Sequence, residues 1–341
     1  MAAMNQGLFL AIETSCDETA VALARSDGEI VVSRVASQIE LHSPYGGVVP
    51  ELASRNHNTD LRPLVEACLA DVGVEWSQIV AVAATSGPGL ASSLLVGDTT
   101  SKAIAVALQC PFYSINHMEG HLLSPFIGTG IEIRNHIALV VSGGHTMLVH
   151  LSGIGRYQIL GSTKDDAAGE AFDKVGKMLD LPYPGGPELA KRAANGNRKA
   201  YEFPRSMLDS GDFDFSFSGL KTSARYMLEK LDQPIQSTVL DDVCASFQEA
   251  IVDVLVKKLF RAAEETGCDL VSVSGGVSCN LRLRERVAAA GEAAGIEAMV
   301  PEPSYSTDNA AMIAFAAAKR AGAGFPGDSL NSDIDPNMKL A

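Results

Sequence analysis

The chain has 341 residues, of which 46% are hydrophobic and 20% charged, and its formal net charge is −14. This composition predicts a soluble folded protein, and no apolar run approaches the roughly 20 residues that a membrane span needs. The negative charge argues against tight nucleic-acid binding by this chain alone, because phosphate contacts need clustered lysine and arginine. Six cysteines without a C-x-x-C pair, and an N-terminus without a secretory signal, predict reduced thiols and a cytoplasmic location.

The first third of the chain alternates apolar runs with polar turns. Strands are predicted at residues 8–12, 20–24 and 30–35, and the polar turn 13–19 separates the first two. Hydroxyl and N–H groups of that turn could hold a phosphate, or they could satisfy only the turn itself. A helix from about residue 54, a strand at 79–84 and a helix at 90–108 follow.

A pair of histidines follows the next short strand, residues 112–115. His117 and His121 are four residues apart, so a helix would place both imidazoles on one face, where they could bind one divalent metal ion. Ordinary hydrogen-bonded histidines are the alternative. A zinc protease is disfavoured, because Met118 and Gly120 stand where protease motifs carry glutamate. Glu119 lies about 200° around the helix from each histidine and points away from their shared face.

The second half of the chain repeats the order of elements without repeating the sequence. Strands are predicted at 137–141, 146–150, 157–160 and 270–274, with a long helix at 245–263. The repeated order predicts an α/β protein of two similar lobes with a cleft between them. We expect an N-terminal lobe of residues 1–130, onto which a last helix at 308–321 packs back, and a C-terminal lobe of residues 131–307. Two basic clusters, within 191–199 and 257–261, are interpreted as solvated helix faces.

Three glycine-rich turns of the second lobe, 142–145, 183–187 and 274–280, indicate a nucleotide site, because glycine lets the backbone approach a ligand closely. Neither a P-loop nor a Rossmann glycine motif is present. Asp173 lies in a predicted helix and could accept hydrogen bonds from a ribose or another polar group. Asp308 precedes the last helix, where it could be an N-cap or the carboxylate that completes a two-histidine metal site suited to iron or zinc.

Together these stretches carry a family resemblance. The sequence resembles the bacterial tRNA N6-adenosine threonylcarbamoyltransferases, once labelled glycoproteases, in motifs that run in the family's order through nearly the whole chain. The matching stretches are residues 13–19, 45–55, 117–121, 141–145, 165–174, 183–187, 215–222, 274–280 and 307–309.

The resemblance implies the two-lobed actin/Hsp70/sugar-kinase-like fold, built from duplicated ribonuclease-H-like units. It implies transfer of a threonylcarbamoyl group from threonylcarbamoyl-AMP to N6 of adenosine 37 in tRNAs that read codons beginning with A. The expected metal ligands are His117, His121 and Asp308, with Fe²⁺ favoured and Zn²⁺ possible. The residues expected to hold the adenylate are Val141, Ser142, Gly143, Gly144, His145, Asp173, Gly186 and Asn280.

The resemblance also implies partners: tRNA, a paralogous dimer-partner subunit and a small ATPase subunit, with no membrane. The general base is not identifiable from the sequence, and Glu13 and Asp17 are the candidates. One departure is visible, since family members often end in a basic segment with tryptophan whereas residues 331–339 are acidic and lack it. This departure puts contact of the tail with tRNA in doubt.

Three other functions are weighed against this one. An actin-like ATPase or sugar kinase explains the lobes and glycine turns but leaves His117, His121 and Asp308 without a role. A metalloprotease lacks the required glutamate positions. A non-catalytic scaffold would tolerate His117→Ala without loss of tRNA modification. The transferase accounts for all of the motifs and is preferred.

Overall fold

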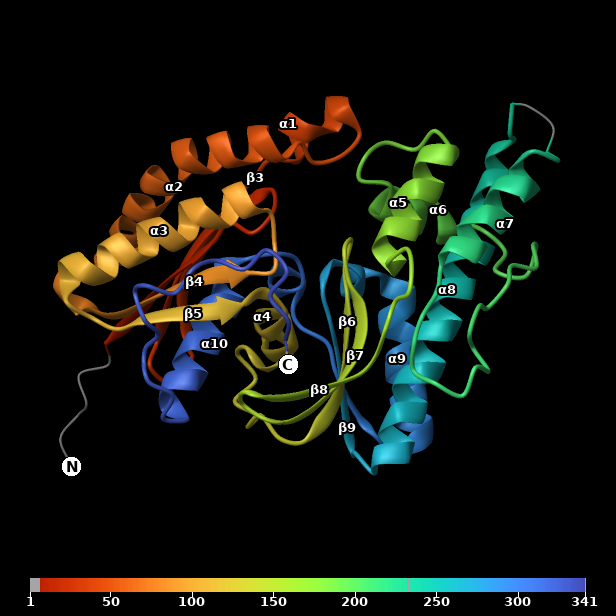
Figure 1. The fold of residues 1–341 in the computed structure, drawn as a ribbon. Coiled ribbons are helices and arrows are strands. Elements are labelled where there is room, and N and C mark those ends of the chain that lie inside the picture. The colour runs from red at the N-terminus through yellow and green to blue at the C-terminus, as the bar shows by residue number, and fades with distance from the viewer. Residues whose placement is uncertain (1–6, 232–233, 341) are drawn as a thin grey trace. The chain divides into compact units, whose positions relative to one another are not determined.

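The computed structural model describes residues 7–231 and 234–340 (Figure 1). The chain divides into two compact units. Unit 1 is Met1–Ile133 together with Thr307–Ala341, and unit 2 is Arg134–Ser306. Each unit is built around one five-stranded mixed sheet, so the fold is of the α/β class.

The sheet of unit 1 has the strand order β3-β2-β1-β4-β5. Its strands are β1 (Leu8–Glu13), β2 (Glu18–Arg25), β3 (Ile30–Ser37), β4 (Ile79–Gly87) and β5 (Phe112–Asn116). β1, β2 and β3 form an antiparallel meander, and β4 and β5 continue the sheet parallel to β1. β1 is buried throughout, and the apolar run of its residues 8–12 is what a strand covered on both faces requires.

Helices cover both faces of this sheet (Figure 1). α2 (Pro50–Val72) and α3 (Ala91–Leu108) pack on one side, with the short α1 (Ile39–His42) preceding them. On the other side α10 (Ala310–Gly322) packs against β1 and β2 and against α4 (His117–Leu123). α10 is rich in alanine, and its residues from Ala310 to Ala318 are buried, so its backbone lies close to the sheet.

The sheet of unit 2 repeats the topology of unit 1. Its strands are β6 (His136–Val141), β7 (Thr146–Gly153), β8 (Arg156–Ser162), β9 (Leu270–Ser274) and β10 (Glu297–Met299), in the order β10-β9-β6-β7-β8. Again three antiparallel strands come first, and two strands parallel to the first of them follow. The order of elements that the sequence predicted is therefore present in both sheets.

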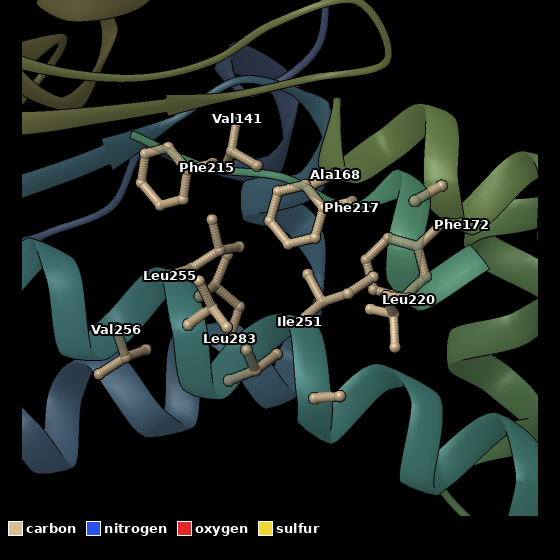
Figure 2. Packing of buried hydrophobic residues seen from close by; sticks show 14 of the residues in the cluster. Val141, Ala168, Phe172, Phe215, Phe217, Leu220, Ile251, Leu255, Val256 and Leu283 are labelled. Carbon is tan, nitrogen blue, oxygen red and sulfur yellow. The ribbon is translucent and has the colours of Figure 1, made fainter. Parts of the chain in front are cut away.

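The helices of unit 2 share one hydrophobic core with its sheet. They are α5 (Ala168–Met178), α6 (Gly185–Ala193), α7 (Ser218–Leu228), α8 (Ser237–Thr266) and α9 (Leu281–Ala294). Figure 2 shows Phe215, Phe217 and Phe172 in this core with Ile251 and Leu255 of α8. Burial of each such side chain contributes about 1.5–3 kcal/mol, which ties the long α8 to the rest of the unit.

The loop before α7 is held by two charged side chains, the exposed Asp165 and the buried Lys258. The Asp165 carboxylate accepts hydrogen bonds from the hydroxyls of Ser216 and Ser218, each at 2.6 Å, and from the N–H of Phe217 at 2.8 Å. Lys258 of α8 is fully buried and donates to the Ser210 hydroxyl at 3.2 Å and to backbone oxygens of the same loop. The interpretation of this lysine as part of a solvated face was wrong, since the loop folds over it.

Among the residues that the structure describes, no helix is both long and apolar enough to span a bilayer.

Candidate metal centre and substrate-binding turns

The histidine pair lies on α4, which begins directly after β5. The Asn116 side chain caps this helix by accepting a hydrogen bond from the N–H of Met118 at 2.8 Å. His117 and His121 are both buried, and their rings meet edge to face with centroids 4.8 Å apart. The predicted one-face arrangement of the two imidazoles is thus present in the fold.

Asp308 brings its carboxylate to the same point. Its Oδ1 lies 3.0 Å from Nε2 of His121 and 3.4 Å from Nε2 of His117, and the three potential ligand atoms lie within 4.8 Å of one another. The N-cap of α10 is the next residue, Asn309, whose Oδ1 accepts from the N–H of Met312 at 3.0 Å. Asp308 is therefore not occupied as the helix cap, which was its alternative role.

Glu13 supports His117 from the side away from Asp308. It ends β1, is buried, and its Oε2 lies 3.0 Å from Nδ1 of His117. The Thr85 hydroxyl donates to the same oxygen at 2.5 Å, and the Ser15 N–H donates to the other carboxylate oxygen. These contacts fix the imidazole with Nε2 toward Asp308, and a carboxylate bonded to the other ring nitrogen is usual for a metal-binding histidine.

The electrostatics favour a cation at this point. Burial lowers the pKa of His117, but the negative charges of Asp308 and Glu13 outweigh it and hold that pKa well above its usual value. Burial would raise the pKa of Asp308, yet His117 and then His121 hold it well below its usual value. Two Nε2 atoms and one carboxylate oxygen that converge in this way match the donor set and spacing of a divalent metal ion. A metal bound there would compete with the proton on His117.

Glu119, between the two histidines in sequence, turns the other way. It is fully buried and pairs with Arg320, whose Nη2 lies 2.7 Å from Glu119 Oε2 and whose Nε donates to Oε1 at 3.0 Å. This pairing ties α4 to α10. It also takes up the only acidic side chain of α4, which could otherwise have served as the base of a protease.

The polar turn after β1 satisfies its hydroxyl groups within the protein. Thr14 donates to the Ser93 carbonyl at 2.8 Å, and the Ser15 hydroxyl lies 3.1 Å from Nδ1 of His117. Asp17 is half-buried, and its backbone carbonyl accepts a hydrogen bond from the Gln38 N–H. Beside it, burial and the charges of Asp308 and Asp17 raise the pKa of Glu18 to about 9. Glu18 belongs to the polar turn 13–19, but no feature of the sequence distinguished it from the other polar residues of that turn.

In unit 2, the predicted turn 142–145 joins β6 to β7. The Ser142 N–H donates to the His145 carbonyl at 2.8 Å, and the His145 N–H donates to the Ser142 hydroxyl at 3.1 Å. Gly143 and Gly144 are exposed, with open space where side chains would stand. Gly169, at the start of α5, donates to the Ser142 carbonyl at 3.2 Å. The hairpin is therefore bonded to the first turn of α5, and its two glycines face open space.

Two more close approaches of backbone occur at these turns. Gly275 has φ +88°, and a Cβ there would lie 2.4 Å from the Val141 carbonyl oxygen, so only glycine fits. Gly186, in the first turn of α6, donates its N–H to Asp173 Oδ1 at 2.8 Å. Burial raises the pKa of Asp173, while the N–H groups of this turn oppose the rise.

Asn280 is the N-cap of α9. Its Oδ1 accepts from the Leu283 N–H at 3.1 Å, and its Nδ2 donates to Gln248 Oε1 at 2.7 Å. Of the residues predicted to hold the adenylate, Val141, Ser142 and His145 lie together at the end of β6, in contact with Gly169 and Gly275. Asp173 and Gly186 form a second group, linked by their own hydrogen bond.

The comparison with known proteins decides the family. The sequence model of the TsaD family, described as tRNA N6-adenosine threonylcarbamoyltransferase, matches residues 29–315. The chain belongs to this family. The predictions of the family and of acyltransferase activity are thereby confirmed.

Two relatives carry the name tRNA N6-adenosine threonylcarbamoyltransferase. The one from Syntrophotalea carbinolica is 46% identical over 332 residues, which cover 97% of this chain and 95% of the relative. The one from Geobacter sulfurreducens is 51% identical over 307 residues, covering 90% of each chain.

Solved structures identify the fold. The structure of full-length HypF in its phosphate- and nucleotide-bound form matches with a TM-score of 0.63 at 12% identity, over 93% of this chain and 46% of that one. At this identity the likeness concerns the fold alone. The prediction of an actin/Hsp70/sugar-kinase-like α/β fold is confirmed.

Proposed function

We propose that this chain transfers the threonylcarbamoyl group from threonylcarbamoyl-AMP to N6 of adenosine 37 in tRNAs that read codons beginning with A. The observation that carries the proposal is the convergence of His117, His121 and Asp308 in a chain of this family. The metal centre lies in unit 1, and the proposed adenylate-binding turns lie in unit 2.

Fe²⁺ is the metal we favour, with Zn²⁺ as the second choice. Two histidines and one carboxylate that leave other positions open are typical of iron(II) sites, and zinc accepts the same donors. When bound, a divalent ion here would act as a Lewis acid toward an oxygen of the substrate. His117, His121 and Asp308 would hold it, and Glu13 would keep His117 in the binding tautomer.

The chemistry requires an acid–base group and an anion site. N6 of adenine attacks the carbamoyl carbon, the bond from that carbon to the phosphate oxygen breaks, and AMP leaves while N6 loses a proton. Glu13 is buried and its carboxylate is already bonded, so its contacts suit positioning better than proton transfer. Asp17, half-buried in the turn after β1, remains the candidate base.

We place the adenylate at the glycine turns of unit 2. The exposed Gly143 and Gly144 can present N–H groups to a phosphate, with Val141, Ser142 and His145 shaping the hairpin. Asp173 with Gly186, and Asn280 at the start of α9, complete the proposed set.

The partners follow from the charge and the family. A net charge of −14 makes this chain a poor tRNA binder by itself, so a paralogous dimer-partner subunit would supply part of the tRNA surface. A small ATPase subunit would complete the assembly. We expect the complex to work in the cytoplasm.

The test is a reconstituted transfer assay. The chain, its two partner subunits and unmodified ANN-decoding tRNA are mixed with threonylcarbamoyl-AMP, and threonylcarbamoyl-adenosine is measured by mass spectrometry. Wild type should form product, whereas His117→Ala and Asp308→Ala should form at most about a hundredth as much. Equal product from wild type and both variants would remove the metal centre from the mechanism. Absence of product with active partners would refute the transferase proposal for this chain.

A further inference from the structure

The segment after α10 is the least regular part of unit 1, and yet it is bonded to the sheet along most of its length. We call residues 325–340 the strap. Within it no helix or strand is formed. Figure 1 shows it in dark blue, passing along β5 and β4.

The strap first covers the free edge of the sheet. β5 is an edge strand, so one side of its backbone has no partner strand. Asp328 fills this side: its N–H donates to the Phe112 carbonyl at 2.7 Å, and its carboxylate accepts from the Ser114 N–H at 2.8 Å. Lys102 then donates to the Ser332 carbonyl at 2.5 Å.

The strap next crosses the carboxyl end of β4. The Asp335 N–H donates to the Ser86 carbonyl at 2.9 Å, and the Gly89 N–H donates to the Pro336 carbonyl at 3.2 Å. The approach is close enough that a Cβ on Gly87 would lie 1.9 Å from the Asp335 oxygen. This turn directly follows Thr85 of β4, and the Thr85 hydroxyl holds Glu13 behind His117.

The strap ends on the cap of the histidine helix. Asn116 uses both ends of its amide: Oδ1 accepts from the Met118 N–H at 2.8 Å, and Nδ2 donates to the Lys339 carbonyl at 3.1 Å. Asn116 is buried, and His117 is the next residue. The last residues of the strap therefore set the orientation of the amide that starts α4.

We propose that the strap is a positioning element of the metal centre: by fixing Asn116 and the end of β4, it holds His117 and His121 in register with Asp308 and slows release of the metal. The inference rests on the metal centre proposed above. Asn116 acts through the helix that it caps and touches no substrate. Most strap contacts use its backbone, so its composition can vary while its function persists.

The test compares three forms of the full chain: wild type, a deletion of residues 335–341, and Asn116→Ser. Serine keeps an N-cap acceptor but lacks the amide NH₂ group that reaches the Lys339 carbonyl. Each form is loaded with Co²⁺, whose visible spectrum reports ligand geometry, and the Co²⁺ off-rate is measured against excess chelator. Hydrogen exchange of the α4 amides is followed in parallel without metal. A change of stability alone would leave the Co²⁺ spectrum unaltered.

We expect the deletion, which removes the three hydrogen bonds made by Asp335, Pro336 and Lys339, to change the Co²⁺ spectrum and to raise the off-rate about tenfold. Asn116→Ser, which removes one of them, should raise the off-rate about threefold. Exchange of the α4 amides should rise in both variants. If the deletion variant does not fold, Asn116→Ser carries the test alone. An unchanged spectrum, off-rate and α4 exchange in folded variants would overturn the inference. Failure of wild type to bind Co²⁺ would instead refute the metal centre, and the α4 exchange would still show whether the strap fixes the helix.

Discussion

Glu13→Gln should weaken metal binding without emptying the site. The variant keeps the size of the side chain and can still accept from Thr85, but it removes the charge that faces Nδ1 of His117 at 3.0 Å. Loss of a carboxylate that is bonded to a metal-binding histidine typically costs about 10–100-fold in metal affinity. Because glutamine can still accept one hydrogen bond, we expect the lower end, about tenfold or about 1.4 kcal/mol.

The pH dependence sharpens this prediction. Glu13 is one of the two charges that hold the pKa of His117 well above its usual value, so its removal lowers that pKa. A proton then competes less with the metal in the variant than in wild type. The loss of affinity should therefore be largest at about pH 8 and smaller at about pH 6, where the proton competes strongly in wild type.

The assay is competitive titration of Zn²⁺ against a chelator at both pH values. The matched control is Glu119→Gln, which also neutralises a buried carboxylate in unit 1, but one that pairs with Arg320 instead of His117. It should change Zn²⁺ affinity less than threefold, within the range of an indirect effect. Wild-type affinity in Glu13→Gln, alongside loss of binding in His117→Ala, would refute the role given to Glu13. Equal losses in both glutamine variants would show a general effect of destabilisation.

Three further predictions concern unit 2. Gly169→Ala would place a Cβ 2.5 Å from the Ser142 carbonyl oxygen. We expect the free energy of unfolding in urea to fall by about 1–3 kcal/mol and AMP binding, measured by calorimetry, to weaken. Unchanged AMP binding would show that this hairpin does not hold the adenylate. Burial lowers the pKa of His136 to about 4, whereas it is about 6.5 in the unfolded chain. The free energy of unfolding should therefore fall by about 3 kcal/mol as the pH drops from about 6.5 to about 4. In urea titrations, His136→Asn should reduce this dependence of stability on pH. Lys258→Met should cost on the order of 3 kcal/mol because buried loop oxygens lose their donor; a loss below about 1 kcal/mol would mean that the loop relaxes around the change.

The fold class was predictable because the order of elements, more than any single residue, distinguishes it. Both sheets consist of an antiparallel meander followed by two parallel strands, and each strand appears in the sequence as an apolar run. Boundaries were less accurate, since α8 extends over Ser237–Thr266 whereas the sequence indicated 245–263. Its additional turns carry polar residues that helical periodicity does not reveal.

The convergence of the three proposed metal ligands was partly predictable, because part of its geometry is local. The spacing of His117 and His121 is local, so the helix alone determines their shared face. Asp308 was ambiguous, because aspartate and asparagine are comparable N-caps and two of them stand together. Only the fold shows that Asn309 takes the cap and leaves the neighbouring carboxylate for the histidines.

The role of Glu13 could be recognised only from the strand order. Glu13 and Asn116 end two strands that are parallel in the sheet, with β4 and its Thr85 between them. Glu13 and His117, 104 positions apart in the chain, therefore meet at the carboxyl end of these strands. The strap is harder still to predict, because it binds mainly through backbone groups: every residue carries the C=O, and every residue except proline carries the N–H. The acidic residues after α10 are therefore compatible with an ordered segment, since its order is determined by the edge and end of the sheet that it covers. The residues around such a segment indicate it: Gly87 leaves room for the strap, and the Asn116 amide has one group to spare after capping α4.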